Sequence, residues 1–225
     1  MCGRYTLHAP PDQIGELFDL VAPDDLEPRY NIAPSQAVPA VSVVGTGERQ
    51  VAMLAWGLLP SWAKDPKIGY RMINARSETA ASKPSFRRAF KHARCLVLTD
   101  GFYEWRKEGP GKQPYYIRMR DRRPFAFAGL REHWEGSDGS VIDSCTILTT
   151  EPNELLSPIH DRMPVILERR HYDQWLDPEG NDAESLMQLL RAYEPDEMTA
   201  FPVSTLVNKP STDVPECIAP LASLA

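Results

Sequence analysis

Cys2 offers the most distinctive chemistry in this sequence, because removal of Met1 would place a free α-amine next to its thiol. An α-amine titrates at about 7.7–8.0 and a free thiol at about 8.5, so a fraction of each group is nucleophilic at neutral pH. The amine can form a Schiff base with an aldehyde, and the thiol can then close a five-membered thiazolidine ring. A processed Cys2 is therefore predicted to capture aldehydes if the fold positions it and supplies proton transfers. Taken alone, Cys2 can also be a buried and inert cysteine.

The elements that must position Cys2 can be predicted from the spacing of apolar residues. Ile14, Leu17, Phe18 and Val21 recur at helical spacing after Pro10-Pro11-Asp12, which predicts a short amphipathic helix and leaves Cys2 on an extended segment before it. Further helices are expected at Ser77–His92, Glu151–Ile159, Glu168–Leu176 and Asp182–Tyr193. Strands are expected at Val38–Val44, Gln50–Trp56, Cys95–Thr99, Tyr115–Met119, Phe125–Gly129 and Ile142–Thr149.

Closely spaced strands without regular helical crossovers predict an α+β fold with a largely antiparallel, barrel-like β core and peripheral helices. No repeat or long linker divides the chain, so we expect one domain over residues 1–225. The four cysteines are scattered and form neither a C-x-x-C pair nor a zinc-ligand cluster, so we expect no disulfide, metal or cofactor. No apolar run has the length of a membrane span or resembles a signal peptide, so we expect a cytoplasmic protein.

Charge is unevenly distributed along the chain, whose net charge is −6. Residues 71–94 contain seven basic residues and one acid, whereas residues 173–197 contain one basic residue and eight acids. A basic face on an acidic protein can hold a short anionic strand without coating a long polymer. Two solvated helix faces of opposite sign would explain the same pattern.

Six sequence blocks, in order and spanning nearly the whole chain, resemble the SOS response-associated peptidase family, whose members crosslink to abasic sites in single-stranded DNA. The blocks are Met1-Cys2-Gly3-Arg4-Tyr5, Arg29-Tyr30-Asn31-Ile32-Ala33-Pro34, Trp56-Gly57-Leu58-Leu59-Pro60-Ser61-Trp62, Ile73-Asn74-Ala75-Arg76-Ser77-Glu78-Thr79, Asp100-Gly101-Phe102-Tyr103-Glu104-Trp105 and Ile159-His160-Asp161-Arg162-Met163-Pro164. Pro202-Val203-Ser204 and Val207-Asn208 also fit the family pattern.

The resemblance implies a catalytic role for four residues. Glu104 would move the proton that opens the abasic sugar, which requires that burial raise its pKa. His160 would be the second proton-transfer group, and Asn74 would orient the Cys2 amine. Each residue also has an ordinary structural alternative: a solvent-facing strand residue for Glu104, a surface ion pair for His160 and a turn or helix cap for Asn74.

The same resemblance places single-stranded DNA next to these residues. Arg4, Arg76 and Arg162 lie inside the blocks and are candidate phosphate ligands, and Arg87 and Arg88 are further candidates. Trp62 lies on a loop flanked by prolines and is a candidate platform for base stacking, whereas Trp56 ends a strand and is expected in the core.

We therefore expect a monomer that forms a thiazolidine crosslink between Cys2 and the ring-opened abasic deoxyribose, and so shields the site from strand cleavage. Self-removal of Met1, weak lyase activity through the Schiff base, association with the bacterial nucleoid when bound to DNA and contact with replication-fork proteins would accompany this role. Two alternatives remain open. One is a hydrolase or peptidase with Cys2 as N-terminal nucleophile, and the other is a module that binds single-stranded DNA without covalent chemistry.

Overall fold

The computed structural model describes residues 2–44, 47–179 and 182–221. Its strands are β1 (Tyr5–Leu7), β2 (Arg29–Ile32), β3 (Ala37–Val44), β4 (Glu48–Trp56), β5 (Asn74–Arg76), β6 (Arg94–Thr99), β7 (Gly101–Glu108), β8 (Gly111–Met119), β9 (Phe125–Glu135), β10 (Val141–Thr150), β11 (Met163–Pro164), β12 (Ile166–Leu167) and β13 (Met198–Pro202). Its helices are α1 (Pro11–Phe18), α2 (Ser77–Ala80), α3 (Arg87–His92), α4 (Tyr172–Leu176) and α5 (Ala183–Met187). Short 3-10 turns lie at Pro66–Arg71, Arg169–His171, Pro195–Glu197, Thr205–Asn208 and Pro215–Ile218.

A closed ring of strands forms the centre of the fold. Within the described residues, β10, β4, β3, β6 and β9 pair in that order, and β9 pairs back to β10 to close the ring. All of these pairs are antiparallel except β10 with β4. The α+β class and the largely antiparallel, barrel-like core predicted from the sequence are thus confirmed. Closure leaves the ring strands without open edges.

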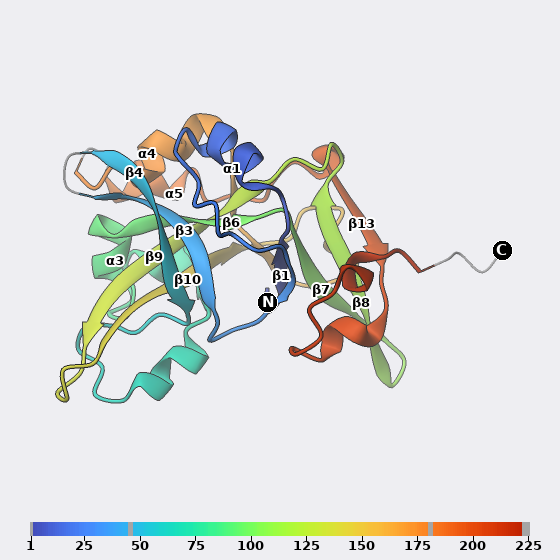
Figure 1. Cartoon of the computed structure of the whole chain (residues 1–225), viewed down its shortest axis with the longest axis horizontal. Helices are drawn as coiled ribbons and strands as arrows, with labels where there is room; N and C mark the ends of the chain where they lie inside the picture. The colour runs from blue at the N-terminus through green and yellow to red at the C-terminus, as the bar shows by residue number, and fades with distance from the viewer. Residues whose placement is uncertain (1, 45–46, 180–181, 222–225) are drawn as a thin grey trace.

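A second sheet, in the order β13-β8-β7-β1-β2, packs beside the barrel. Its strand β1 lies between the barrel and the strands β7 and β8, and α1, α4 and α5 lie together at one end of the molecule (Figure 1). Tyr5 of β1 is fully buried, and its ring meets Trp56 and Phe127 of the barrel edge-on at centroid distances of 5.1 and 5.8 Å. The segment that begins with Cys2 is therefore anchored in the core that the two sheets share.

All of the strands expected from the sequence are present, and most extend beyond the expected ends. The helices are shorter than the sequence predicts. Helix α1 ends at Phe18 because Asp19 adopts a left-handed conformation (φ 53°), so Val21 lies outside the helix and is 95% exposed. The helix expected over Ser77–His92 is interrupted between α2 and α3, where Pro84 supplies no backbone N–H.

Three other helix predictions need correction. The expected helix at Glu151–Ile159 is wrong: the segment forms turns, in which the Asn153 side chain accepts a hydrogen bond from the backbone N–H of Leu156 at 3.0 Å. The segment Asp182–Tyr193 is helical only in α5, and Leu189 and Leu190 then bond three residues back as in tighter turns. The segment Glu168–Leu176 divides into a 3-10 turn and α4.

Across the described ranges, no helix combines the length and apolar character required to traverse a bilayer. Within the same ranges, no cluster of three or more His, Cys, Asp and Glu side chains is arranged to hold a metal ion.

Candidate reactive centre

Cys2 lies three residues before the start of β1 and is fully buried. Its Sγ lies 3.9 Å from the carbonyl oxygen of Arg4, which is a weak hydrogen-bond contact. Burial, and then the negative charge of Glu104, raise the pKa of the Cys2 thiol well above its usual range. The thiol is therefore protonated at neutral pH, and a nearby base must take its proton before sulfur can attack. Met1, and with it the predicted processing step, lies outside the described residues.

Pairing of β1 with β7 brings Glu104 to Cys2. Tyr5 pairs with Phe102, and the backbone N–H of Tyr103 donates to the Arg4 carbonyl at 3.0 Å. Continued by one residue, this antiparallel register sets Glu104 opposite Gly3, the neighbour of Cys2, and the charge of Glu104 acts on the Cys2 thiol. Glu104 is 1% exposed, and burial raises the pKa of its carboxyl group to about 7. This carboxyl group can both donate and accept a proton near neutrality, and it is not a solvent-facing strand residue.

Asn74 reaches the same place from the barrel side. It begins β5, which pairs in parallel with β10, and the preceding carbonyl, of Ile73, accepts a hydrogen bond from the Trp56 indole at 2.8 Å. The Asn74 Nδ2 donates to the Cys2 carbonyl oxygen at 2.7 Å. Its Oδ1 is buried and has no hydrogen-bond partner among the described residues. Asn74 therefore fixes the Cys2 backbone and keeps one acceptor available for a group that enters the site.

His160 approaches Glu104 from the turn that precedes β11. Its Nε2 lies 3.9 Å from Glu104 Oε2, and its Nδ1 accepts a hydrogen bond from the backbone N–H of Arg162 at 3.0 Å. Burial lowers the pKa of His160, which favours the neutral ring. Because Nδ1 accepts in that form, the proton resides on Nε2, the nitrogen that faces Glu104. Asp161 Oδ1 lies 2.9 Å from Nδ1, so the ion pair considered from the sequence would form only with a protonated ring, which burial disfavours.

The structure thus brings Cys2, Asn74, Glu104 and His160 together, and we call these four residues the reactive centre. Two come from segments of the second sheet, one from β5 beside the barrel and one from a turn. The arrangement supplies a fixed backbone next to a thiol, a buried carboxyl group that titrates near neutrality and a neutral imidazole beside it. Such a set suits stepwise proton transfer around a nucleophile.

Two of the candidate DNA-binding arginines are held inside the fold. One Arg4 amino group donates to Asn31 Oδ1 at 2.9 Å and to the Val207 carbonyl at 2.8 Å. Arg162 forms a two-pronged ion pair with Glu78 at 2.6 and 2.9 Å, as well as a hydrogen bond to a backbone carbonyl. Both side chains therefore have structural partners already, which the sequence did not indicate.

The remaining candidates are open to solvent. We call Trp62, Arg76, Arg87 and Arg88 the exposed set. Trp62 is 57% exposed, and Arg88 is 70% exposed and contacts Ser61, the neighbour of Trp62, at 3.2 Å. Trp56, by contrast, is buried in the core as expected.

Some notable residues were missed by sequence reasoning. Tyr70 is 67% exposed on the 3-10 turn Pro66–Arg71, and its position beside Arg71 in the basic segment was an available signal. Asn31 and Asp100 are buried polar residues that tie β1 to its surroundings. Both lie inside the family blocks, which was the only sequence signal for them.

Comparison with known proteins identifies relatives of this chain. The family model described as SOS response associated peptidase (SRAP) matches residues 1–210. The chain is 46% identical to "Abasic site processing protein YoqW" of Bacillus subtilis (strain 168), over 97% of this chain and 99% of that protein. It is 33% identical to "Abasic site processing protein HMCES" of Xenopus tropicalis, over 87% of this chain and 67% of that protein. A crystal structure of a protein from Bacteroides thetaiotaomicron superposes with a TM-score of 0.83 at 27% identity, covering 98% of this chain and 100% of that one.

Proposed function

This chain belongs to the SOS response associated peptidase family, and we propose that it captures abasic sites in single-stranded DNA through a covalent thiazolidine bond to Cys2. The observation that carries the proposal is the contact of Asn74 with the Cys2 carbonyl beside the pair of Glu104 and His160. The names of the relatives, which are abasic site processing proteins, support the substrate. The crosslink would shield the damaged sugar from strand cleavage.

The first chemical step is opening of the abasic sugar, which is mostly a closed hemiacetal. Protonated Glu104 donates a proton to the ring oxygen, the bond between this oxygen and the anomeric carbon breaks, and the anomeric hydroxyl gives its proton to a water molecule as the aldehyde forms. A carboxyl group with a pKa of about 7 is half protonated at neutral pH, so it supplies both forms in useful amounts. The burial that raises this pKa would therefore contribute directly to catalysis.

Ring closure then follows in two steps. The α-amine of processed Cys2 attacks the aldehyde carbon, and water leaves to give the Schiff base. The thiol sulfur adds to the imine carbon, and the thiol proton reaches the nitrogen through the Glu104 carboxylate. The net reaction converts aldehyde and aminothiol to thiazolidine and one water molecule. Because the Cys2 thiol is protonated in its buried position, a base has to take this proton, and the Glu104 carboxylate is the group that we assign to it.

The DNA strand would be held by the exposed set. Trp62 offers a face for base stacking, and Arg76, Arg87 and Arg88 offer guanidinium groups for phosphates. Arg4 and Arg162 would take part from inside the site, and a phosphate on Arg162 has to replace Glu78. Self-removal of Met1 and weak lyase activity from the Schiff base are finer parts of the same proposal.

The test is incubation of the chain, with Met1 removed as verified by mass spectrometry, with a single-stranded oligonucleotide that bears one abasic site. We expect a covalent adduct that survives denaturing electrophoresis, and no adduct with an oligonucleotide that carries a tetrahydrofuran analogue without an aldehyde. Absence of an adduct overturns the proposal. Turnover of a peptide substrate without any aldehyde would instead support the hydrolase alternative.

A further inference from the structure

The placement of Glu104 beside Cys2 depends on the register of β1 against β7. Side chains alternate between the two faces of a strand, so a slip of one residue would carry Glu104 to the opposite face. Cys2 precedes β1 and Glu104 lies on β7, but β1 is short (Tyr5–Leu7), and within the described residues its ladder to β7 has two pairs, Tyr5 with Phe102 and Thr6 with Gly101. So short a ladder depends on further contacts to hold its register.

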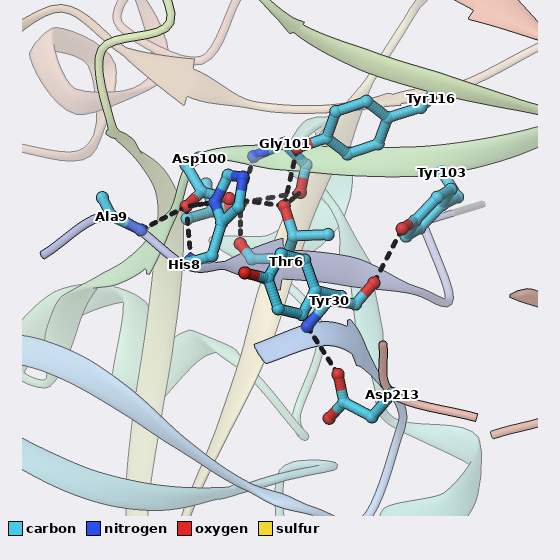
Figure 2. A network of polar contacts seen from close by, with 10 residues as sticks. Thr6, His8, Ala9, Tyr30, Asp100, Gly101, Tyr103, Tyr116 and Asp213 are labelled. Atoms are coloured by element: carbon cyan, nitrogen blue, oxygen red, sulfur yellow. Dashed lines mark hydrogen bonds and ion pairs between the residues drawn. The ribbon is translucent and has the colours of Figure 1, made fainter. Parts of the chain in front are cut away.

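Asp100, the residue before β7, binds the far end of the β1 segment through four donors (Figure 2). Its Oδ1 accepts from the Thr6 hydroxyl, and its Oδ2 accepts from the backbone N–H of Ala9 at 2.7 Å. The backbone N–H of His8 and the His8 ring nitrogen Nδ1 contact the same Oδ2. The carboxylate is buried, so these contacts are poorly replaced by water.

The backbone around Asp100 reinforces this connection. The Asp100 N–H donates to the Thr6 carbonyl at 3.1 Å, and the Thr99 hydroxyl donates to the same oxygen at 3.0 Å. The Thr6 hydroxyl also lies 2.9 Å from the Tyr116 hydroxyl. At Gly101 an added Cβ would lie 2.2 Å from the Tyr116 oxygen, so the close approach requires glycine. Polar contacts and close packing therefore specify the same register.

The pairing at the other edge of β1, with β2, does not fix the register of β1 in the same way. This pairing changes register between Tyr5 and Leu7. Strand β2 has its own carboxylate, Asp213, which accepts from the backbone N–H groups of Tyr30 and Asn31 at 2.5 and 2.9 Å. Asp213 thus binds β2 in a way that resembles Asp100 on β1, but among the described residues it forms no hydrogen bond with β1 or β7, so it serves as a control.

We propose that Asp100 is a positioning residue for the crosslinking reaction: it fixes the register of β1 against β7 and thereby holds Cys2 beside Glu104. The inference rests on the proposed function. Asp100 is a buried carboxylate outside the reactive centre, and we expect it to affect the rate of crosslinking and not the affinity for DNA. Displacement of reacting groups by about 1 Å can slow a reaction by about 10²-fold, so a shift in register should be clearly measurable.

The test separates rate from binding in the full chain with Met1 removed. For Asp100→Ala we expect crosslinking at saturating abasic DNA to slow by at least about tenfold, at a temperature where the variant is folded. Affinity for the tetrahydrofuran oligonucleotide should stay within about twofold of wild type. Asp100→Asn should recover most of the rate, because its amide oxygen can still accept from the His8 and Ala9 N–H groups.

Asp213→Ala is the matched control, because it also removes a carboxylate that accepts two backbone N–H groups. It should lower the melting temperature and leave the crosslinking rate per folded molecule unchanged. Thr6→Val provides a milder test if Asp100→Ala does not fold, with an expected slowing of about threefold from the loss of the hydroxyl that contacts Asp100 and Tyr116.

A wild-type rate in the folded Asp100→Ala variant, or in Thr6→Val if that is the variant tested, overturns the inference. An equal loss of rate in Asp100→Ala and Asp213→Ala would overturn it as well. Failure of the proposed function is distinguishable, because wild type itself would then form no adduct.

Discussion

The reactive centre and the exposed set differ above all in their contact with water. Cys2 and Glu104 are buried, and their pKa values are raised by that burial. Trp62 and Arg88 are largely exposed, and Arg88 contacts Glu132 and Ser61, the neighbour of Trp62. Burial changes proton affinities strongly, whereas exposed charges in water interact weakly and are screened by salt.

This contrast divides the proposed activity into two separable parts. The buried residues should control the rate of bond formation, and the exposed residues should control how tightly the DNA strand is held. Substitutions in the two regions should therefore change different measured quantities. A variant that changes both would show that the regions are coupled.

The largest effect is expected for Cys2→Ala. This variant retains an α-amine after processing but has no thiol, so a Schiff base can form and the thiazolidine ring cannot. We expect the stable adduct to disappear completely in denaturing electrophoresis. Affinity for the tetrahydrofuran oligonucleotide, measured by fluorescence anisotropy, should remain within about twofold of wild type. Cys217→Ala, which removes another buried thiol outside the reactive centre, should form the adduct normally.

Glu104→Gln should follow, with crosslinking slower by about 10²- to 10⁴-fold at saturating DNA, the range typical for loss of a general acid–base group. Glutamine keeps the shape of the side chain, so folding and DNA affinity should be preserved. Glu108→Gln is the matched control, because Glu108 lies on the same strand but is exposed. Equal rates for Glu104→Gln and wild type would remove Glu104 from the mechanism.

The raised pKa of Glu104 also predicts how stability depends on pH. Burial raises this pKa from 4.5 to about 7 in the folded protein, so the folded state holds the proton more tightly than the unfolded state does. The stabilisation associated with the neutral carboxyl group is fully present below about pH 4.5 and is lost as pH rises to about 7. Relative to Glu104→Gln, wild type should lose melting temperature over this window and stay level above it. Parallel melting curves for the two proteins at all pH values would contradict the burial effect.

The same contrast explains what the sequence could predict. Strands in the barrel carry runs of apolar and β-branched residues, and these runs indicated the elements that the structure contains. The helix at Glu151–Ile159 failed because prolines and the Asn153 side chain favour turns, a local competition that apolar spacing does not register. The family blocks indicated all four residues of the reactive centre, and the structure places these residues together.

The contacts of polar residues whose partners lie far away along the chain could not be predicted from the sequence. Asn31 donates to three backbone carbonyls near residues 207–212, and Asp100 accepts from residues more than 90 positions away. Asn and Asp are also common in surface turns. Arg162 illustrates the reverse case: its position suggested a phosphate ligand, and the structure gives it Glu78 as partner. Tertiary contacts decide such roles, and these contacts could not be predicted from a single sequence.

On the exposed side, Trp62→Ala should weaken binding and leave the chemistry intact. Loss of one base-stacking platform costs about 1–3 kcal/mol, which corresponds to roughly 5- to 150-fold in affinity. We expect this loss for the tetrahydrofuran oligonucleotide, with an unchanged crosslinking rate once DNA is saturating. Trp62→Phe should retain part of the affinity because it keeps an aromatic face. A slower rate at saturation would show that Trp62 also positions the abasic sugar.

The smallest effect is expected for Arg88→Gln. Each phosphate contact to single-stranded DNA adds about 0.7 to the slope of log affinity against log salt, so the variant should lower that slope by about 0.7. The loss of affinity should be modest, because Arg88 gives up its ion pair with Glu132 in part when it binds phosphate. Arg170→Gln is the control, since Arg170 pairs with Glu168 away from the basic segment and should leave the slope unchanged. Equal slopes for Arg88→Gln and wild type would place the strand elsewhere, and the exposed set would then have to be redrawn around Arg76 and Arg87.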